Sequence, residues 1–218
     1  QEKRRRHLPH CRSPAVPACD MAVEGDYSQA AFLAVLGVLL GGITVSGLDT
    51  ASRQGDRVIL DILKSFGGKM ANVSGGVRFS RSLLKGGDID LADCPDLGPV
   101  LIALGCFCNG PTTIRNAGRL RIKESDRINA MQQELGKMGG KVQVIGDTIT
   151  VPGSVLRAPE QPLYGHNDHR IVMALTVAAL AAGVPATIRG AEAVRKSWPH
   201  FFDVMRSLGA KIDLVEEE

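Results

Sequence analysis

Five charged side chains lie within seven positions in the stretch RIKESDR, from Arg121 to Arg127. Apolar residues follow at helical spacing, at Ile128, Met131, Leu135 and Met138. This stripe predicts a helix that begins near Ser125, a residue type preferred at the N-cap. Backbone N–H groups at a helix start, with Arg and Lys beside them, favour a phosphate or a carboxylate, and a carboxylate held among cations can transfer a proton. The stretch therefore indicates an anion site with acid–base chemistry, although a solvated, well-capped helix start would show the same pattern.

The elements that would position such a site are three long apolar stretches, each with an aspartate at its start. Asp26 precedes SQAAFLAVLGVLL, Asp96 precedes LGPVLIALGCF, and Asp168 precedes HRIVMALTVAALAA. Each stretch is apolar on nearly all sides, so each is predicted to form a buried helix. The three aspartates would then lie at helix starts that face one end of the molecule.

Two further features recur with the same period of about 70 residues, which is typical of a repeated structural unit. A short predicted strand follows a glycine turn at Gly42, Gly110 and Gly183. A predicted helix closes with a glycine, and a strand is expected after it, at Gly67, Gly139 and Gly209. The second unit also contains a predicted hairpin, with strands at 141–145 and 148–151. Each unit thus reads roughly helix, strand, helix, strand, strand.

These units predict an α/β (α+β) domain of three repeats, with the helices inside and the sheets outside, because no unit can bury its apolar helix alone. The predicted repeats cover about residues 22–85, 86–155 and 156–218 of a single domain. Residues 1–21 contain three prolines, a run of basic residues and no apolar periodicity. We therefore predict that they form a disordered or foreign basic tail.

The composition disfavours several classes of protein. The chain has 218 residues, of which 44% are hydrophobic and 22% charged, enough to bury a sizeable core. No apolar run approaches the roughly 20 residues that cross a bilayer, and no signal-peptide core is present, so we predict a cytoplasmic protein without membrane contact. The net charge of +3 is carried by residues 1–21, and aromatic content is 4%, which disfavours nucleic-acid binding.

The five cysteines are odd in number and form no CxxC pair, so neither a disulfide framework nor a zinc site is indicated. Cys106 and Cys108 are predicted to pack at a helix end. We predict no metal ion and no cofactor.

Six short stretches together resemble the 5-enolpyruvylshikimate-3-phosphate synthase family, the enolpyruvyl transferases of the shikimate pathway. They are VEGDYSQAAF (Val23 to Phe32), QGD (Gln54 to Asp56), CPDLGPV (Cys94 to Val100), LRIKESDR (Leu120 to Arg127), NDHRIVM (Asn167 to Met173) and RKSWPHFF (Arg195 to Phe202). Their order and spacing make the resemblance specific, and it covers the chain from about Val23 to Val215. It implies a transferase of aromatic amino-acid biosynthesis with two similar domains, each an inverse α/β barrel of three βαβαββ units, and an active site in the cleft between them. The repeats described above match one such domain.

The resemblance also implies a reaction and a set of residues. The 5-hydroxyl of shikimate 3-phosphate would add to C2 of phosphoenolpyruvate, and phosphate would leave from a tetrahedral adduct. Asp96 would accept the hydroxyl proton, and Glu124, assisted by Lys196, would handle the proton at the methylene carbon. The implied binding residues are Arg127, Arg170 and Lys196 for phosphoenolpyruvate, and Asp96 and Lys123 for shikimate 3-phosphate. The alternative explanations are that Asp96 is an N-cap residue and that Arg127 and Arg170 are solvated helix residues.

Two parts of the family pattern are not found in this sequence: the other domain, and a short segment with cationic ligands that completes the present one. We therefore expect an incomplete half enzyme that is inactive or very weak alone, with a complementary second domain as its partner. Two alternatives stay open from the sequence. One is a domain similar to UDP-N-acetylglucosamine enolpyruvyl transferase, and the other is a non-catalytic binding or scaffold domain.

Overall fold

The computed structural model describes residue 20 and residues 23–216. The tail predicted at residues 1–21 lies, apart from Asp20, outside the described residues. Among the described helices, none combines the length and the apolar character needed to cross a membrane.

The described elements alternate between helices and short strands. The α-helices are α1 (Tyr27–Leu40), α2 (Val58–Ser65), α3 (Gly98–Gly105), α4 (Arg127–Lys137), α5 (His169–Ala182) and α6 (Phe201–Ser207). Short 3₁₀ helices are η1 (Gly55–Arg57), η2 (Pro95–Leu97), η3 (Ala117–Ile122) and η4 (Ala191–Lys196). The strands are β1 (Ile43–Ser46), β2 (Lys69–Val73), β3 (Gly76–Ser80), β4 (Asp88–Asp90), β5 (Thr112–Arg115), β6 (Gln143–Ile145), β7 (Thr148–Val151), β8 (Leu163–Tyr164) and β9 (Ile188–Arg189).

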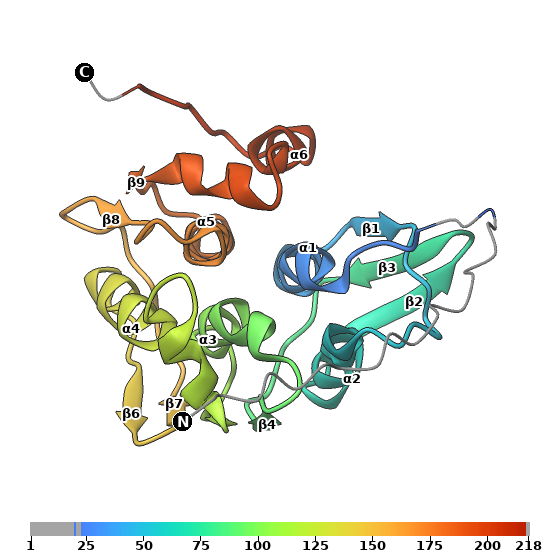
Figure 1. Cartoon of the computed structure of the whole chain (residues 1–218), viewed down its shortest axis with the longest axis horizontal. Coiled ribbons are helices and arrows are strands. Elements are labelled where there is room, and N and C mark those ends of the chain that lie inside the picture. Colours follow the sequence, from blue (N-terminus) through green and yellow to red (C-terminus); the bar gives the residue numbers. More distant parts are fainter. Residues whose placement is uncertain (1–19, 21–22, 217–218) are drawn as a thin grey trace, which may run out of the picture.

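The three predicted apolar helices, α1, α3 and α5, contact one another in the middle of the molecule, and the sheets lie around them (Figure 1). Every residue of α3 is buried, as are the first 11 residues of α5, from His169 to Ala179. A helix that is apolar on all sides must be covered on all sides, and this arrangement covers them. The prediction that these helices are buried together, with the sheets outside, is confirmed.

Each sheet belongs to one unit of the chain. The first sheet has the antiparallel order β1-β3-β2, and the second has the order β4-β5-β7-β6 with β4 parallel to β5. The third sheet is the parallel pair β8-β9. The two parallel pairs are each joined through a buried helix, α3 or α5, which is the geometry of a βαβ crossover. Within the described residues, only the second unit shows the full βαβαββ order, and the predicted unit boundaries fall in the loops after β3 and β7.

Several local predictions are confirmed. Gly67, Gly139 and Gly209 have φ angles of 89°, 83° and 95°, which only glycine adopts without strain, so each ends its helix as expected. The predicted hairpin forms around Gly146, with Ile145 paired to Thr148, but its first strand begins at Gln143, two residues later than predicted. Cys106 and Cys108 are buried beyond the end of α3, with their thiols directed at backbone carbonyls of that helix.

The strand predicted after Gly209 is wrong, because residues 210–216 form no strand. A strand needs a hydrogen-bonded partner for its backbone, and the third sheet within the described chain contains only β8 and β9. The backbone here is held instead by the side chain of Arg206, whose Nε donates to the carbonyl of Ile212 at 2.9 Å.

The prediction that Ser125 is the N-cap of α4 is also wrong, because the cap lies one residue later. Asp126 caps the helix, since its side chain accepts from the backbone N–H of Asn129 at 3.1 Å. The hydroxyl of Ser125 donates instead to Asp168 at 3.1 Å. Ser125 is therefore part of a contact between two units rather than of the local helix start.

Candidate anion-binding and acid–base site

The residues predicted to carry the chemistry converge at the N-terminal ends of α4 and α5. Arg127 is the first residue of α4, Arg170 is the second residue of α5, and Asp96 lies in η2 just before α3. Lys123 and Glu124 lie between η3 and α4, and Lys196 ends η4. The site is thus assembled from elements of different units, which the packing of α1, α3 and α5 brings to one end of the molecule.

Two of the three helix-start aspartates cap their helices, and the third does not. Asp26 accepts from the N–H of Ser28 at 2.8 Å, and Asp168 accepts from the N–H of Arg170 at 2.9 Å. Asp96 makes no cap hydrogen bond, because α3 follows η2 directly and its preceding residue is Leu97. The explanation of Asp96 as an N-cap residue is therefore wrong, and its carboxylate is turned toward cations instead.

Arg127 is a buried cation that bridges two of the aspartates. Its side chain is only 3% exposed. Its Nε donates to Asp168 Oδ2 at 2.8 Å, and its Nη1 donates to Asp96 Oδ1 at 3.0 Å. Asp168 itself is fully buried. A buried carboxylate needs charge compensation, and Arg127 supplies it with a forked geometry that Lys could not match.

Arg170 joins the third unit to the first. Its Nη2 donates to the hydroxyl of Ser28 at 3.0 Å and lies 3.4 Å from Asp96 Oδ2. Its Nη1 also donates to the carbonyl of Asp96 at 3.3 Å. Arg127 and Arg170 are both buried, so the alternative that they are ordinary solvated helix residues is wrong.

Asp96 has three cationic neighbours in total, since Lys123 Nζ lies 3.0 Å from its Oδ1. Burial raises the pKa of Asp96, but Arg170, Lys123 and Arg127 together outweigh this effect and hold the pKa below its ordinary value. Asp96 is therefore ionised at neutral pH and can accept a proton only if its cations are drawn to another anion.

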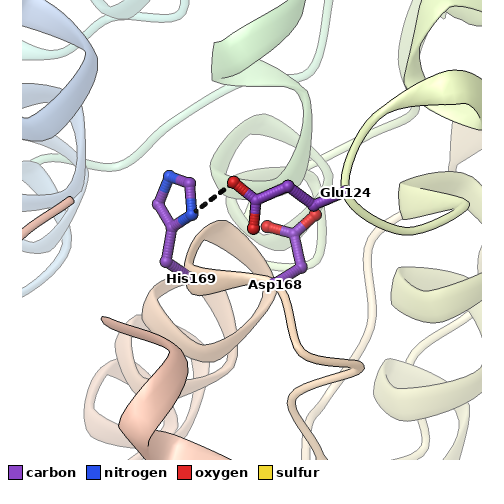
Figure 2. A group of neighbouring side chains, drawn as sticks. All are labelled: Glu124, Asp168 and His169. Atoms are coloured by element: carbon purple, nitrogen blue, oxygen red, sulfur yellow. Dashed lines mark ion pairs between the residues drawn. The ribbon is translucent and has the colours of Figure 1, made fainter. Parts of the chain in front are cut away.

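Glu124 forms a second, more exposed acid–base group. Its Oε2 lies 3.4 Å from Lys196 Nζ, and Lys196 also donates to the carbonyl of Asn167. On its other side, Oε1 lies 3.1 Å from Nδ1 of His169, as Figure 2 shows. That nitrogen is buried without an aligned hydrogen bond, so the contact is close but poorly directed. Desolvation lowers the pKa of His169 although Glu124 opposes it, so the imidazole is neutral at pH 7.

The cluster of Glu124, Asp168 and His169 has its potential ligand atoms within 4.8 Å of one another (Figure 2). The donor set nevertheless does not suit a metal ion. Asp168 accepts from Ser125, from the N–H of Arg170 and twice from Arg127. These four donors use the lone pairs that a cation would need, and Arg127 places a positive charge beside them.

Asp56 is a further carboxyl at the edge of the same cluster. Burial, together with the negative charges of Asp96 and Asp26, raises its pKa to about 6, although Arg170 partly opposes this. The residue lies in η1, inside the QGD stretch, where the sequence analysis gave it no role. Near neutral pH Asp56 thus holds a proton more readily than Asp96 or Asp168, whose pKa values are lowered.

Comparison with known proteins identifies the family. Residues 9–205 match the family model of EPSP synthase (3-phosphoshikimate 1-carboxyvinyltransferase). The chain belongs to the EPSP synthase family. It is 45% identical over 199 residues to the 3-phosphoshikimate 1-carboxyvinyltransferase of Clostridium kluyveri and 42% identical over 197 residues to that of Methanocaldococcus jannaschii. These alignments cover 89% of this chain but 45% and 46% of the relatives, so the chain spans about half their length.

Solved structures agree with this assignment. The EPSP synthase of Acinetobacter baumannii matches with a TM-score of 0.71 and 26% identity, over 85% of this chain and 46% of that one. The enolpyruvyl transferase NikO of Streptomyces tendae matches with a TM-score of 0.67 at 21% identity, over 88% of this chain and 45% of that one, and supports the fold alone. The predicted α/β enolpyruvyl-transferase fold is therefore confirmed.

The EPSP synthase motifs locate the charged residues of the site but not their supports. All of the predicted residues Asp96, Lys123, Glu124, Arg127, Arg170 and Lys196 lie in this cluster. The supports Ser28, the carbonyl of Asn167 and the imidazole of His169 carried no predicted role, although each lies within a stretch that the resemblance used. The only signal in the sequence was that each lies beside a motif residue, because each acts through a contact with a residue distant in sequence.

Proposed function

We propose that this chain supplies one side of an enolpyruvyl-transfer site, which acts on phosphoenolpyruvate and shikimate 3-phosphate. The observation that carries this proposal is the convergence of Arg127, Arg170 and Lys123 on the ionised carboxylate of Asp96, with Lys196 paired to Glu124 nearby. Enolpyruvyl transfer needs an acceptor for a hydroxyl proton, an acid at a methylene carbon and cations for two anionic substrates. The cluster contains a candidate for each role.

In the proposed reaction, the 5-hydroxyl oxygen of shikimate 3-phosphate forms a bond to C2 of phosphoenolpyruvate and its proton passes to Asp96. Glu124 gives a proton to C3, which produces the tetrahedral adduct. In the second step a C3 proton returns to Glu124 and the C2–O bond to phosphate breaks. The leaving phosphate takes the proton from Asp96, so inorganic phosphate departs and Asp96 is ionised again. Lys196 stabilises the charge on Glu124 and helps hold the phosphate.

Without substrate, the carboxylate of Asp96 pairs with Lys123, Arg127 and Arg170. It thus occupies the cations that would otherwise bind the anionic group of a substrate. A phosphate or carboxylate that engages Arg127, Arg170 or Lys123 would draw these cations from Asp96. The pKa of Asp96 would then rise, since its charged form would lose opposite charges. Substrate binding and the basicity of Asp96 are coupled in this way.

We further propose that the complete site requires a second domain, as the length of the relatives suggests. In a closed two-domain site, substrates react while surrounded on all sides and shielded from water. Correct orientation alone can lower the activation free energy by about 7–11 kcal/mol. The present chain would contribute its cations and both acid–base groups but only part of the enclosure. The complete two-domain protein, in this proposal, carries out the reaction in the cytoplasm.

The direct test of the site is a titration of the full chain with inorganic phosphate and then with phosphoenolpyruvate, followed by NMR. We expect weak binding, in the millimolar range, with shifts at Arg127, Arg170 and Lys196, because several partner cations would come from the second domain. Arg170→Lys should weaken binding of both anions, since Lys cannot reproduce the fork of Arg.

The matched control is Arg78→Ala, which removes an exposed arginine from β3 and leaves the cluster intact. It should bind both anions as the unaltered chain does. Arg170→Lys keeps the net charge and Arg78→Ala lowers it, so equal weakening by the two variants would show that binding does not depend on the cluster, and the proposed site would then be wrong.

A further inference from the structure

Glu134 is a buried carboxylate on α4 that belongs to none of the roles assigned above. Its side chain is 1% exposed. Oε2 accepts from Lys137 Nζ at 2.7 Å and from the backbone N–H of Tyr164 at 2.9 Å, and Oε1 lies 3.1 Å from Nε2 of His166. Burying a carboxylate is unfavourable unless its partners compensate it, and two of these partners lie about 30 residues away in sequence. Glu134 thus ties α4 to the segment that enters α5.

The segment that Glu134 contacts contains a strained turn. Residues 165–168 form a tight turn in which the N–H of Asp168 donates to the carbonyl of Gly165 at 2.9 Å. The two central residues, His166 and Asn167, have φ angles of 51° and 52°. Positive φ at both positions defines a type I′ turn, which favours Gly, Asn and Asp. Asn167 suits this conformation, whereas His166 is less usual in this turn type, and the contact of its ring with Glu134 helps to hold it there.

The first residue of the turn, Gly165, is closely packed on the side away from Glu134. The N–H of Gly165 donates to the carbonyl of Arg189 at 2.8 Å, and a Cβ at this glycine would come within 2.4 Å of Val172. The turn is therefore packed against β9 and α5 on one side and held by Glu134 on the other. Its position is fixed by contacts from two different units.

The residues that this turn presents are those that hold the cations of the site. The carbonyl of Asn167 accepts from Lys196, and the carboxylate of Asp168 accepts from Arg127. A small rotation of the turn would move both acceptors together. Because charge-assisted contacts depend steeply on distance and angle, such a rotation would change how Lys196 and Arg127 meet an anion.

We infer that Glu134 and His166 are positioning residues, which hold the 165–168 turn so that Asn167 and Asp168 fix Lys196 and Arg127 for anion binding. This inference rests on the proposed function for its consequence, but the geometry of the turn can be measured independently. Neither residue touches the anion. Each acts through the backbone of the turn.

Two variants of the full chain test the inference with inorganic phosphate as the probe. Glu134→Gln keeps the shape of the side chain but removes its charge, and His166→Asn keeps a residue suited to positive φ but is too short to reach Glu134. Each should weaken phosphate binding about tenfold, which corresponds to a coupling of ordinary strength between contacting residues. Amide exchange at Tyr164 and Asp168 should become faster, while exchange within α3 should not change.

The matched control is Gln132→Ala on the same helix. Gln132 donates to the carbonyl of Val142 at 2.8 Å, so it anchors α4 to the hairpin and not to the turn. This variant should bind phosphate as the unaltered chain does. A phosphate affinity lowered equally by Gln132→Ala and Glu134→Gln would show a general effect of α4 packing, and the inference would be overturned.

A double-mutant cycle separates positioning from simple destabilisation. If Glu134 acts through Lys196, then Glu134→Gln should weaken phosphate binding much less in a chain that already carries Lys196→Ala. Fully additive losses would contradict the inference. If the unaltered chain binds no phosphate, the proposed function fails, and exchange at Tyr164 and Asp168 still decides the inference. Unchanged exchange at both amides in both variants would overturn it.

Discussion

The carboxylates of the site differ in the number of cations around them, and this difference sets what each can do. Asp168 is fully buried against Arg127, so its role is to hold that cation. Asp96 has three cationic neighbours but remains about one-third exposed, at 34%, so a substrate could reach it. Glu124 is 36% exposed with Lys196 and His169 beside it. The two carboxylates proposed to exchange protons with substrates are thus partly exposed, whereas the one that only holds a cation is buried.

Breaking the buried pair should be costly. Asp168→Asn leaves the guanidinium of Arg127 without its main counter-charge, and the loss of one partner from a buried pair typically destabilises by about 3–5 kcal/mol. Urea unfolding of the variant would measure this loss. Asp203→Asn is the control, because Asp203 lies on α6 with a side chain that is 65% exposed, and its pairing with Arg206 is expected to contribute less than about 1 kcal/mol. Similar losses in both variants would contradict the buried-pair assignment.

Asp56 predicts a pH dependence of stability with a definite sign. Its pKa is about 6 in the folded state against an ordinary value of 3.8, so the protonated form favours the fold. Its stabilising contribution is complete below about pH 4 and is lost as the pH rises through about 6. Asp56→Asn should therefore be more stable than the unaltered chain at pH 7, by about 1–2 kcal/mol after allowance for partial solvent contact, and equally stable near pH 4.

Urea unfolding between pH 4 and pH 7 measures this difference, and Asp61→Asn provides the control. Asp61 is 61% exposed on α2, so its removal should shift stability little and without this pH dependence. The pKa values of Asp96 and Asp168 are lowered, so the stability that they contribute is lost as the pH falls. This loss is the same in Asp56→Asn and in the unaltered chain, so it cancels when the two are compared. A difference between Asp56→Asn and the unaltered chain that is constant with pH would contradict the assignment.

At the scale of elements, the sequence was most informative where structure depends on local pattern. Apolar residues on all sides of three stretches were enough to predict the buried helices, and Gly67, Gly139 and Gly209 marked helix ends through their backbone freedom. Strand prediction failed at residues 210–216, because a strand exists only with a partner, and the pattern of one segment does not show whether that partner is present. The carbonyl of Asn167 and the Glu134 contacts were missed for the same reason, since they join residues far apart in the chain.

Replacement of glycine by alanine is expected to change the stability in opposite directions in helices α1 and α4. A Cβ at Gly37 of α1 would lie 2.6 Å from Cβ of Phe79, so Gly37→Ala should overpack the contact between α1 and β3 and destabilise by about 1–3 kcal/mol. A Cβ at Gly136 of α4 meets no atom within 4 Å, so Gly136→Ala should stabilise by about 0.5–1 kcal/mol through its helix propensity. Thermal or urea unfolding of the two variants would measure both signs, and equal signs would show that the packing of α1 against β3 is wrong.

For the whole molecule, the arrangement of the units matters more than any single unit. Arg127 and Asp168 join the second and third units, and Arg170 and Ser28 join the third and first. The site therefore exists only when all three units pack through α1, α3 and α5. We expect loss of anion binding and loss of folded structure to occur in one transition on denaturation, which parallel NMR and circular dichroism curves would show. Anion binding that persisted after α1 had unfolded would contradict this coupling.

We propose that this chain carries the Asp96 side of an enolpyruvyl-transfer site and needs a complementary domain to complete it. The most direct test is phosphate release from phosphoenolpyruvate and shikimate 3-phosphate, measured for the chain alone and after mixing with a separately expressed complementary domain from a relative. We expect little release by the chain alone, clear release by the mixture, and loss of that release with Asp96→Asn. Release by the chain alone at the rate of the mixture, or release that survives Asp96→Asn, would contradict it.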